Sequence, residues 1–434
     1  MPTDENRGLL AQAQERSAQR LLLVFALTGL FFMLLPGTFL GVWNLISISA
    51  HHQRTISAAW IQAHGHAQML GWIGTFILGI GFYSLPKMAG QSTRFASSGW
   101  LAWGLWTSGA LLRWFAGVYL WHWKALLPAS ALLELGGFLI FLQSSMKSHR
   151  PGMQGPSGKK LQVWIVAVLA GTAGLLASLL MNLGAAFYVS WTGTDPAFPA
   201  PLESRLLFWL AYGFIVPTIW GFSARWLPVF LGLKPVRESL LRAALIVDFA
   251  AVLAAQVGWF KVAPWLVALA AILSVQAFGL AGPAERPAKT LGVHPSFPWF
   301  VRVAYGWLIV ATAIGIAAAY YDRANGWTGA GRHALTVGFI STMVFSVGQR
   351  ILPAFGGMKV LYSPRLMLTC LLLLNLGCTL RVTSEILAYE GYWPPAWNVL
   401  PYSAVLELMA VTIFAANLVL TFQQPPAHQM QAAG

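Results

Sequence analysis

Two distant stretches of the sequence carry the same residue pattern after a histidine. Counted from His66 and from His333, both have Ala at +1, Gly at +5, Thr at +9, Gly at +15, Leu-Pro at +19 and +20, and Gly at +24. A degenerate third copy begins at Phe208 and keeps Gly at +5, Leu-Pro at +19 and +20, and Gly at +24. A pattern that recurs in this way indicates that the chain is built from equivalent units.

Arginine and glutamate recur together with the two histidines. The sequence GALLR, which ends at Arg113, resembles GCTLR, which ends at Arg381, and PASALLE, which ends at Glu134, resembles PYSAVLE, which ends at Glu407. The first and last thirds of the chain therefore each carry His, Arg and Glu on three successive hydrophobic segments. Ionisable groups inside a bilayer are costly, so these residues are candidates for a functional site.

The histidines are the residues of this set that can bind a metal. A neutral imidazole nitrogen ligates haem iron and copper. His66 and His333 stand at equivalent positions of two repeats, so we expect them at one depth as the two axial ligands of a haem b near the outer face. His64 lies about 200° away from His66 around a helix, so it is predicted either to ligate a second group or to form a hydrogen bond outside the site.

The arginines and glutamates suit supporting roles around such a haem. Guanidinium groups bind carboxylates with paired hydrogen bonds, so Arg113 and Arg381 are candidate partners of the haem propionates. Glu134 and Glu407 are candidates for orienting the histidines or carrying protons. Two alternatives stay open: the arginines extend to the outer headgroups, or the glutamates form buried ion pairs with them.

The composition places these residues in a membrane. Hydrophobic residues make up 57% of the chain and charged residues 9%, with a mean hydropathy of +0.64, whereas about a quarter of a soluble domain is charged. Apolar stretches of about 20 residues, the length that crosses a hydrocarbon core of about 30 Å, occur at twelve places. We expect these helices near residues 20–46, 61–86, 97–120, 125–145, 161–189, 205–230, 241–259, 262–282, 299–321, 332–354, 364–388 and 397–422.

The predicted architecture is an all-α polytopic membrane protein of twelve transmembrane helices, arranged as three four-helix repeats. The repeats cover about residues 21–146, 161–282 and 299–422 of a single membrane domain, between tails at 1–20 and 423–434. Most of the 27 Lys and Arg residues fall on one side of the membrane, which by the positive-inside rule puts both termini in the cytosol. This distribution explains the net charge of +14 without nucleic acid as a partner.

The predicted topology resembles subunit I of the haem–copper oxidase superfamily, which has haem-ligating histidines on its second and tenth helices. The NnrS family is the more specific likeness. Its second helix carries an H-x-H motif followed by Met and Gly, as in His64-Gly-His66-Ala-Gln-Met69-Leu-Gly71, and its tenth helix carries a motif similar to the one at His333. This resemblance implies a haem- and copper-containing protein of the bacterial inner membrane that is linked to nitric oxide tolerance.

The sequence also departs from the oxidases in the residues that bind their second metal. Oxidases and nitric oxide reductases place further ligating histidines on helices six and seven, but residues 205–260 contain no histidine, and Gly331 stands two residues before His333 where another is expected. The usual binuclear oxygen-reducing centre is therefore not expected. The copper of the NnrS family matches no clear set of residues.

Three functions follow from these observations. The first is an NnrS-type haem protein in nitric oxide metabolism or nitrosative-stress defence, which binds nitric oxide, transfers electrons or supports a redox partner. The second is a quinol-linked haem oxidoreductase. The third is a twelve-helix secondary transporter, which is less favoured because the ionisable residues gather toward the outer side and not at the midplane.

Overall fold

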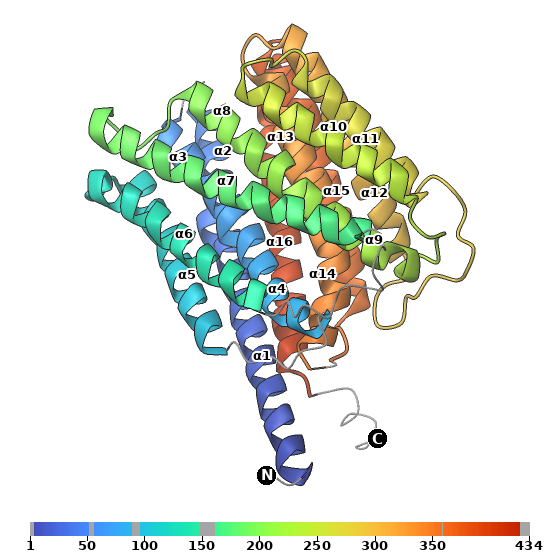
Figure 1. Cartoon of the computed structure of the whole chain (residues 1–434). Coiled ribbons are helices and arrows are strands. Elements are labelled where there is room, and N and C mark those ends of the chain that lie inside the picture. Colours follow the sequence, from blue (N-terminus) through green and yellow to red (C-terminus); the bar gives the residue numbers. More distant parts are fainter. Residues whose placement is uncertain (1–3, 52–55, 89–95, 148–160, 358, 426–434) are drawn as a thin grey trace.

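The computed structural model describes residues 4–51, 56–88, 96–147, 161–357 and 359–425, and within these ranges the chain is helical without any strand (Figure 1). The helices lie side by side as a bundle, and α1 begins at the same end of the bundle at which α16 ends (Figure 1). This common end agrees with the prediction that both termini lie on one side of the membrane. The tail expected at 1–20 is helical from Asp4 as part of α1, and residues 426–434 lie outside the described ranges.

Most of the expected segments form single helices. Their bounds are α5 Ala96–Tyr119, α6 Trp123–Lys147, α7 Val163–Thr192, α10 Glu238–Gln256, α11 Ala263–Phe278, α12 Phe297–Tyr321, α15 Pro364–Tyr389 and α16 Leu400–Gln423, with a 3₁₀ turn η6 at Pro394–Asn398. Local residues set several ends. The α11 helix ends where Gly279 adopts a left-handed φ of 64°, and α15 begins where the Ser363 hydroxyl accepts from the Leu366 amide at 3.3 Å.

Four longer helices pass through a π-helical segment before they return to the α form. They are α1 Asp4–Phe32 with η1 Met33–Phe39 and α2 Leu40–His51; α3 Ala58–His66 with η2 Ala67–Gly74 and α4 Thr75–Met88; α8 Ala200–Phe208 with η4 Trp209–Ile215 and α9 Val216–Phe230; and α13 Gly326–His333 with η5 Ala334–Ser341 and α14 Thr342–Phe355. The segments η2, η4 and η5 begin directly after His66, Phe208 and His333. The wider turn therefore occurs at the same place in all three copies of the sequence pattern.

The residue at +9 explains how this wider turn is accommodated. A π-helix changes which main-chain carbonyls find an amide partner. Thr75 donates its hydroxyl to the carbonyl of Gly71 at 2.5 Å, and Thr342 donates to that of Val337 at 3.4 Å. In the degenerate copy the +9 residue is Pro217, which has no amide hydrogen to offer an α-helical carbonyl.

In the described part of the chain, nine helices are long and apolar enough to cross a membrane. The expected segments 97–120, 241–259 and 262–282 are also helical, as α5, α10 and α11, but they are not among those nine. The chain is thus a multi-pass membrane protein in a lipid environment. The count of twelve crossings stays a prediction.

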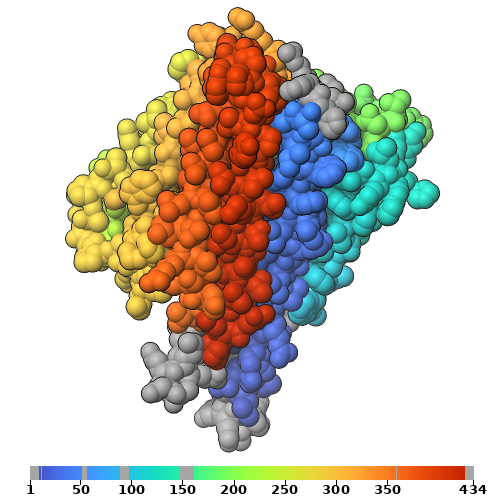
Figure 2. Space-filling view, turned by 180° about the vertical axis from the view of Figure 1, so that it is seen from behind, coloured from blue at the N-terminus to red at the C-terminus, as the bar shows by residue number. Residues whose placement is uncertain are grey.

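Helix pairs that follow one another in the chain pack closely as hairpins, namely α5 with α6, α10 with α11, and α15 with α16. Glycine permits the closest approaches. A methyl group at Gly109 would lie 2.7 Å from Cγ of Glu134, and one at Gly377 would lie 2.8 Å from Cγ of Glu407. From behind, α16 lies beside the N-terminal helices, where it packs against α2 and η1 (Figure 2).

The prolines at +20 do not end their helices. Pro86 lies inside α4, which continues to Met88, and Pro353 lies inside α14, which continues to Phe355. The expected segments 61–86 and 332–354 end within two residues of these helix ends. These helices are joined at their centres by an edge-to-face contact between Trp72 and Phe345, whose ring centroids lie 6.1 Å apart.

Candidate functional site

The first buried charge cluster contains His66 and Glu134. Nε2 of His66 lies 2.6 Å from Oε1 of Glu134, whose side chain is fully buried, and Asn182 donates to the other carboxylate oxygen at 3.5 Å. A carboxylate accepts hydrogen bonds, so Nε2 of His66 carries the proton of this contact. The close packing of Glu134 against Gly109 brings the carboxylate to the imidazole.

Arg113 belongs to the same cluster but makes a different contact. It is 4% exposed, and its guanidinium lies over the ring of Phe198, 4.3 Å from the centroid. Glu203 and Glu134 are within electrostatic reach of it. The main chain at Phe198 is held by Gln62, which donates to its carbonyl at 2.8 Å and accepts from its amide at 2.7 Å.

The second buried charge cluster contains His333, Arg381 and Glu385. The Oε2 atom of Glu385 lies 3.1 Å from Nδ1 of His333 and 3.3 Å from Nε of Arg381, so one carboxylate contacts both side chains. Nδ1 of His333 also donates to the carbonyl of Gly329 at 2.9 Å. Gly329 has a second role here, because a side chain at this position would collide with Glu385.

The structure excludes the alternative in which the arginines extend to the headgroups. It also changes the partner in the alternative in which glutamates pair with the arginines. Arg113 and Arg381 are 4% and 9% exposed, so they do not extend to the headgroups. Arg381 does form a buried ion pair, but with Glu385 and not with Glu407. The Oε1 atom of Glu407 is buried and has no hydrogen-bond partner among the residues that the structure describes, although His333 and Arg381 are within electrostatic reach of this residue.

His64 points away from His66, toward the first helix and the second cluster. Its Nδ1 contacts the carbonyl of Gly37 at 2.8 Å, and a methyl group at Gly41 would lie 2.6 Å from its Cε1. His333 and Arg381 are within electrostatic reach of His64. The opposite directions of His64 and His66 agree with their separation around the helix.

The histidines differ in which nitrogen is free. Backbone carbonyls only accept, so His64 and His333 each carry a proton on Nδ1 and leave the lone pair on Nε2. No described residue hydrogen-bonds to Nε2 of either ring, whereas Nε2 of His66 is engaged by Glu134. In the same described ranges, no group of three or more His, Cys, Asp or Glu side chains is arranged to hold a metal ion.

The sequence comparison between repeats missed Glu385. This residue lies four positions after Arg381 on an apolar segment. That spacing is typical of an ion pair within one helix and can be read from the sequence. The corresponding position after Arg113 is Gly117, so a comparison that sought residues shared by both repeats could not find it. Asn182 and Glu203 were missed for a related reason, because they lie in the second repeat, which lacks the histidine.

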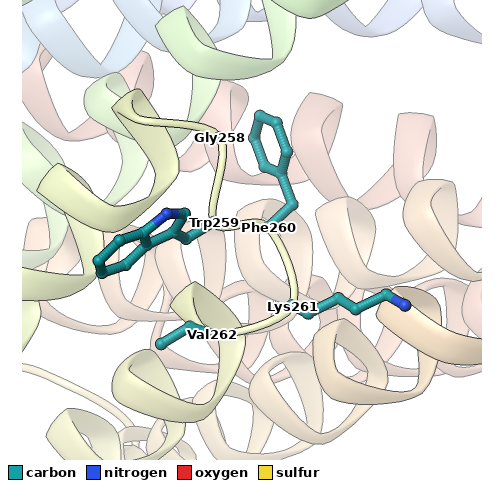
Figure 3. A pocket seen from close by; sticks show the side chains of 5 residues that line it. All are labelled: Gly258, Trp259, Phe260, Lys261 and Val262. Carbon is teal, nitrogen blue, oxygen red and sulfur yellow. The ribbon is translucent and has the colours of Figure 1, made fainter.

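A separate shallow pocket lies in the connection between α10 and α11 and is lined by residues 258–262 (Figure 3). The side chains of Trp259, Phe260 and Lys261 point in different directions from this connection (Figure 3). None of the predicted site residues lines it. The charge clusters, and not this pocket, are therefore the candidate functional site.

The fold defines the class of protein as a multi-pass α-helical membrane protein, and its helices are arranged as in a haem–copper terminal oxidase. A cryo-EM structure of a heme-copper terminal oxidase dimer has a TM-score of 0.70 to this chain at 13% sequence identity, and the match covers 94% of this chain and 85% of that one. At this identity the likeness shows the fold alone. No curated protein matches the chain.

The family is defined by sequence. The family described as a domain of unknown function, DUF8744, matches residues 200–420, just over half of the chain. The chain belongs to this family.

Proposed function

We propose that this protein is a haem-binding membrane protein of the NnrS type, in which His333 and His64 are the axial ligands of a haem b. The observation that carries the proposal is that the two imidazole rings have the same hydrogen bonding. Each has Nδ1 on a backbone carbonyl and a free Nε2, and the two residues are within electrostatic reach of each other. A hydrogen bond from Nδ1 to a carbonyl fixes the tautomer and orients the ring of a metal-ligating histidine.

His66 is the alternative partner of His333. The equivalence of the repeats favours His66, but its Nε2 donates to Glu134 at 2.6 Å, and ligation through this nitrogen requires loss of that contact. We therefore assign His66 and Glu134 to a supporting cluster beside the haem, together with Arg113. Glu407 is a candidate for carrying a proton, since it contacts neither histidine through a hydrogen bond of the described residues.

The buried donors fit the carboxylate groups of a haem. Nη1 of Arg381 has no hydrogen-bond acceptor in the described part of the chain, and the indole nitrogens of Trp114 and Trp327 are buried in the same state. Unsatisfied buried donors are costly, and a propionate would satisfy that of Arg381. A bound haem would supply reversible one-electron chemistry, and the residues of the two clusters would hold and orient it.

The finer architecture is part of the proposal. Twelve crossings in three four-helix repeats, over about residues 21–146, 161–282 and 299–422, are supported by the equivalent positions of η2, η4 and η5. The matched packing of Gly109 on Glu134 and of Gly377 on Glu407 supports them as well. The protein is proposed to lie in a bacterial inner membrane with both termini in the cytosol, in agreement with the charge distribution.

Nitric oxide is the proposed small-molecule partner, with a quinol or a redox protein as the electron partner. The support is the H-x-H motif of His64 and His66 together with the motif at His333, both of which resemble the NnrS family. The absence of histidine from residues 205–260 argues against oxygen reduction at a usual binuclear centre. Copper has no clear ligand set, so its binding is not assigned to residues.

The test is an optical spectrum of the purified protein, oxidised and then reduced, for the wild type and for five single variants. We expect sharp reduced bands in the wild type and in His66→Ala, and their loss or broadening in His64→Ala and His333→Ala. Gly41→Ala should also perturb the bands, because the new methyl group displaces the His64 ring, whereas Gly65→Ala, with open space around it, should not.

Three results would change the proposal. Loss of the bands in His66→Ala with retention in His64→Ala would make His66 the ligand. A wild-type spectrum that does not respond to nitric oxide would remove the nitric oxide assignment. A colourless protein from cells supplied with haem would refute haem binding, and the transporter function would then be favoured.

A further inference from the structure

The second repeat, which lacks the histidine, contains a buried carboxyl group without a partner. Asp248 on α10 is 2% exposed, and its Oδ1 atom has no hydrogen-bond partner among the residues described. It is the eleventh residue of α10, so it lies about 15 Å along the helix from the first residue, Glu238, near the middle of the helix. No residue of the two charge clusters lies on this helix.

The surroundings of Asp248 offer no cation. The elements packed against α10 are α7, α8, η4 and α11. Their titratable residues are Tyr188 on α7, Glu203 and Arg205 on α8 and Tyr212 on η4, while α11 has none, and α10 itself carries Glu238 and Arg242. Among the described residues, none of these side chains forms a hydrogen bond to Oδ1 of Asp248.

A carboxyl group in this position needs a bound positive charge or must be neutral. An ionised carboxylate that is buried without a partner is among the most unfavourable arrangements in a protein. A metal cation would need several oxygen ligands, but the described part of the chain has no group of three or more His, Cys, Asp or Glu side chains that could hold one. A proton needs only one oxygen.

We infer that Asp248 is a proton-binding site in the interior of the second repeat, whose carboxyl group holds a proton at neutral pH. The neutral acid is the resting form, and release of the proton requires a transient partner for the carboxylate. The inference does not depend on the proposed haem, whose ligands lie on α3 and α13.

The experiment is infrared difference spectroscopy of the full-length protein in lipid nanodiscs at pH 7. We expect the wild type minus Asp248→Asn spectrum to contain the carbonyl band of a protonated carboxylic acid, and Asp248→Glu to restore a shifted band. The matched control is Asp195→Asn, which changes a carboxyl group in an exposed loop and should remove only carboxylate bands. Transfer to D₂O should shift the Asp248 band, because the exchangeable proton is part of the acid group.

Two outcomes would overturn the inference. The first is the absence of the protonated band at pH 7 together with its appearance in acid, which would mean that Asp248 is ionised. The second is loss of the band on addition of sodium chloride but not of a bulky organic cation, which would mean that the site binds sodium. Because the readout is vibrational, it is equally informative in a preparation that contains no haem.

Discussion

Glu385 is predicted to be the residue on which the second charge cluster depends. Its carboxylate lies 3.1 Å from Nδ1 of His333 and 3.3 Å from Nε of Arg381, and Arg381 has no other acidic partner in ion-pair distance among the described residues. Replacement by glutamine keeps the shape but leaves the guanidinium buried without a counter-charge. Removal of one partner of a buried pair costs about 3–5 kcal/mol, and we expect Glu385→Gln to lower the free energy of unfolding by that amount.

Glu407→Gln is the matched control. Glu407 is also a glutamate at the same cluster, but its Oε1 atom makes no hydrogen bond with any described residue, so an amide in its place should cost at most about 1 kcal/mol. The two variants should therefore differ by about 2 kcal/mol or more. The assay is unfolding in detergent followed by tryptophan fluorescence, for which the chain has 21 tryptophans.

A double variant tests the cause of the loss. If the loss comes from the uncompensated charge of Arg381, then adding Arg381→Gln to Glu385→Gln should restore part of the stability, because no unpaired charge is left. Equal stabilities of Glu385→Gln and Glu407→Gln would refute the reasoning. So would a double variant that shows only the sum of two independent losses.

Two further predictions concern the packing around the first cluster. Gly109→Ala should destabilise the protein by about 1–3 kcal/mol, because its methyl group meets Glu134 and a main-chain carbonyl. The control Gly104→Ala lies on the same helix with open space around it, and it should be neutral or stabilising by up to about 1 kcal/mol. Equal melting temperatures of the two variants would contradict this prediction. Gln62→Ala should leave the buried amide and carbonyl of Phe198 unpaired, at about 1–3 kcal/mol each. Hydrogen exchange at the Phe198 amide should then accelerate, and unchanged protection would show that Gln62 does not hold this segment.

The repeat was visible in the sequence because several of the positions that its copies share have a local reason. The Gly of GALLR and of GCTLR allows the glutamate helix to approach, and the Thr at +9 donates to a carbonyl of the π-helical segment in both copies. Such requirements depend on residues close in sequence or on one neighbouring helix. For that reason the same residue types recur at the same spacing in both copies of the sequence pattern.

The partners of the charged residues could not be predicted in the same way. The spacing of His64 and His66 places them on different faces of one helix, but it does not say which face meets the first helix and which meets Glu134. Likewise, Glu385 and Glu407 are both acidic residues in apolar segments, and only the packing of α13 on α15 brings Glu385 to His333.

The sequence by itself determined the membrane class, most of the helical positions and the His, Arg and Glu residues that the first and last repeats share, because hydropathy, helix length and the cost of burying charge are local properties. The tertiary structure decided which imidazole nitrogen is free, that Arg381 pairs with Glu385, and that Asp248 lies alone inside the bundle. These facts depend on distances between helices that are far apart in sequence. Such distances are fixed by how side chains of different helices pack together, and no spacing along the chain specifies them.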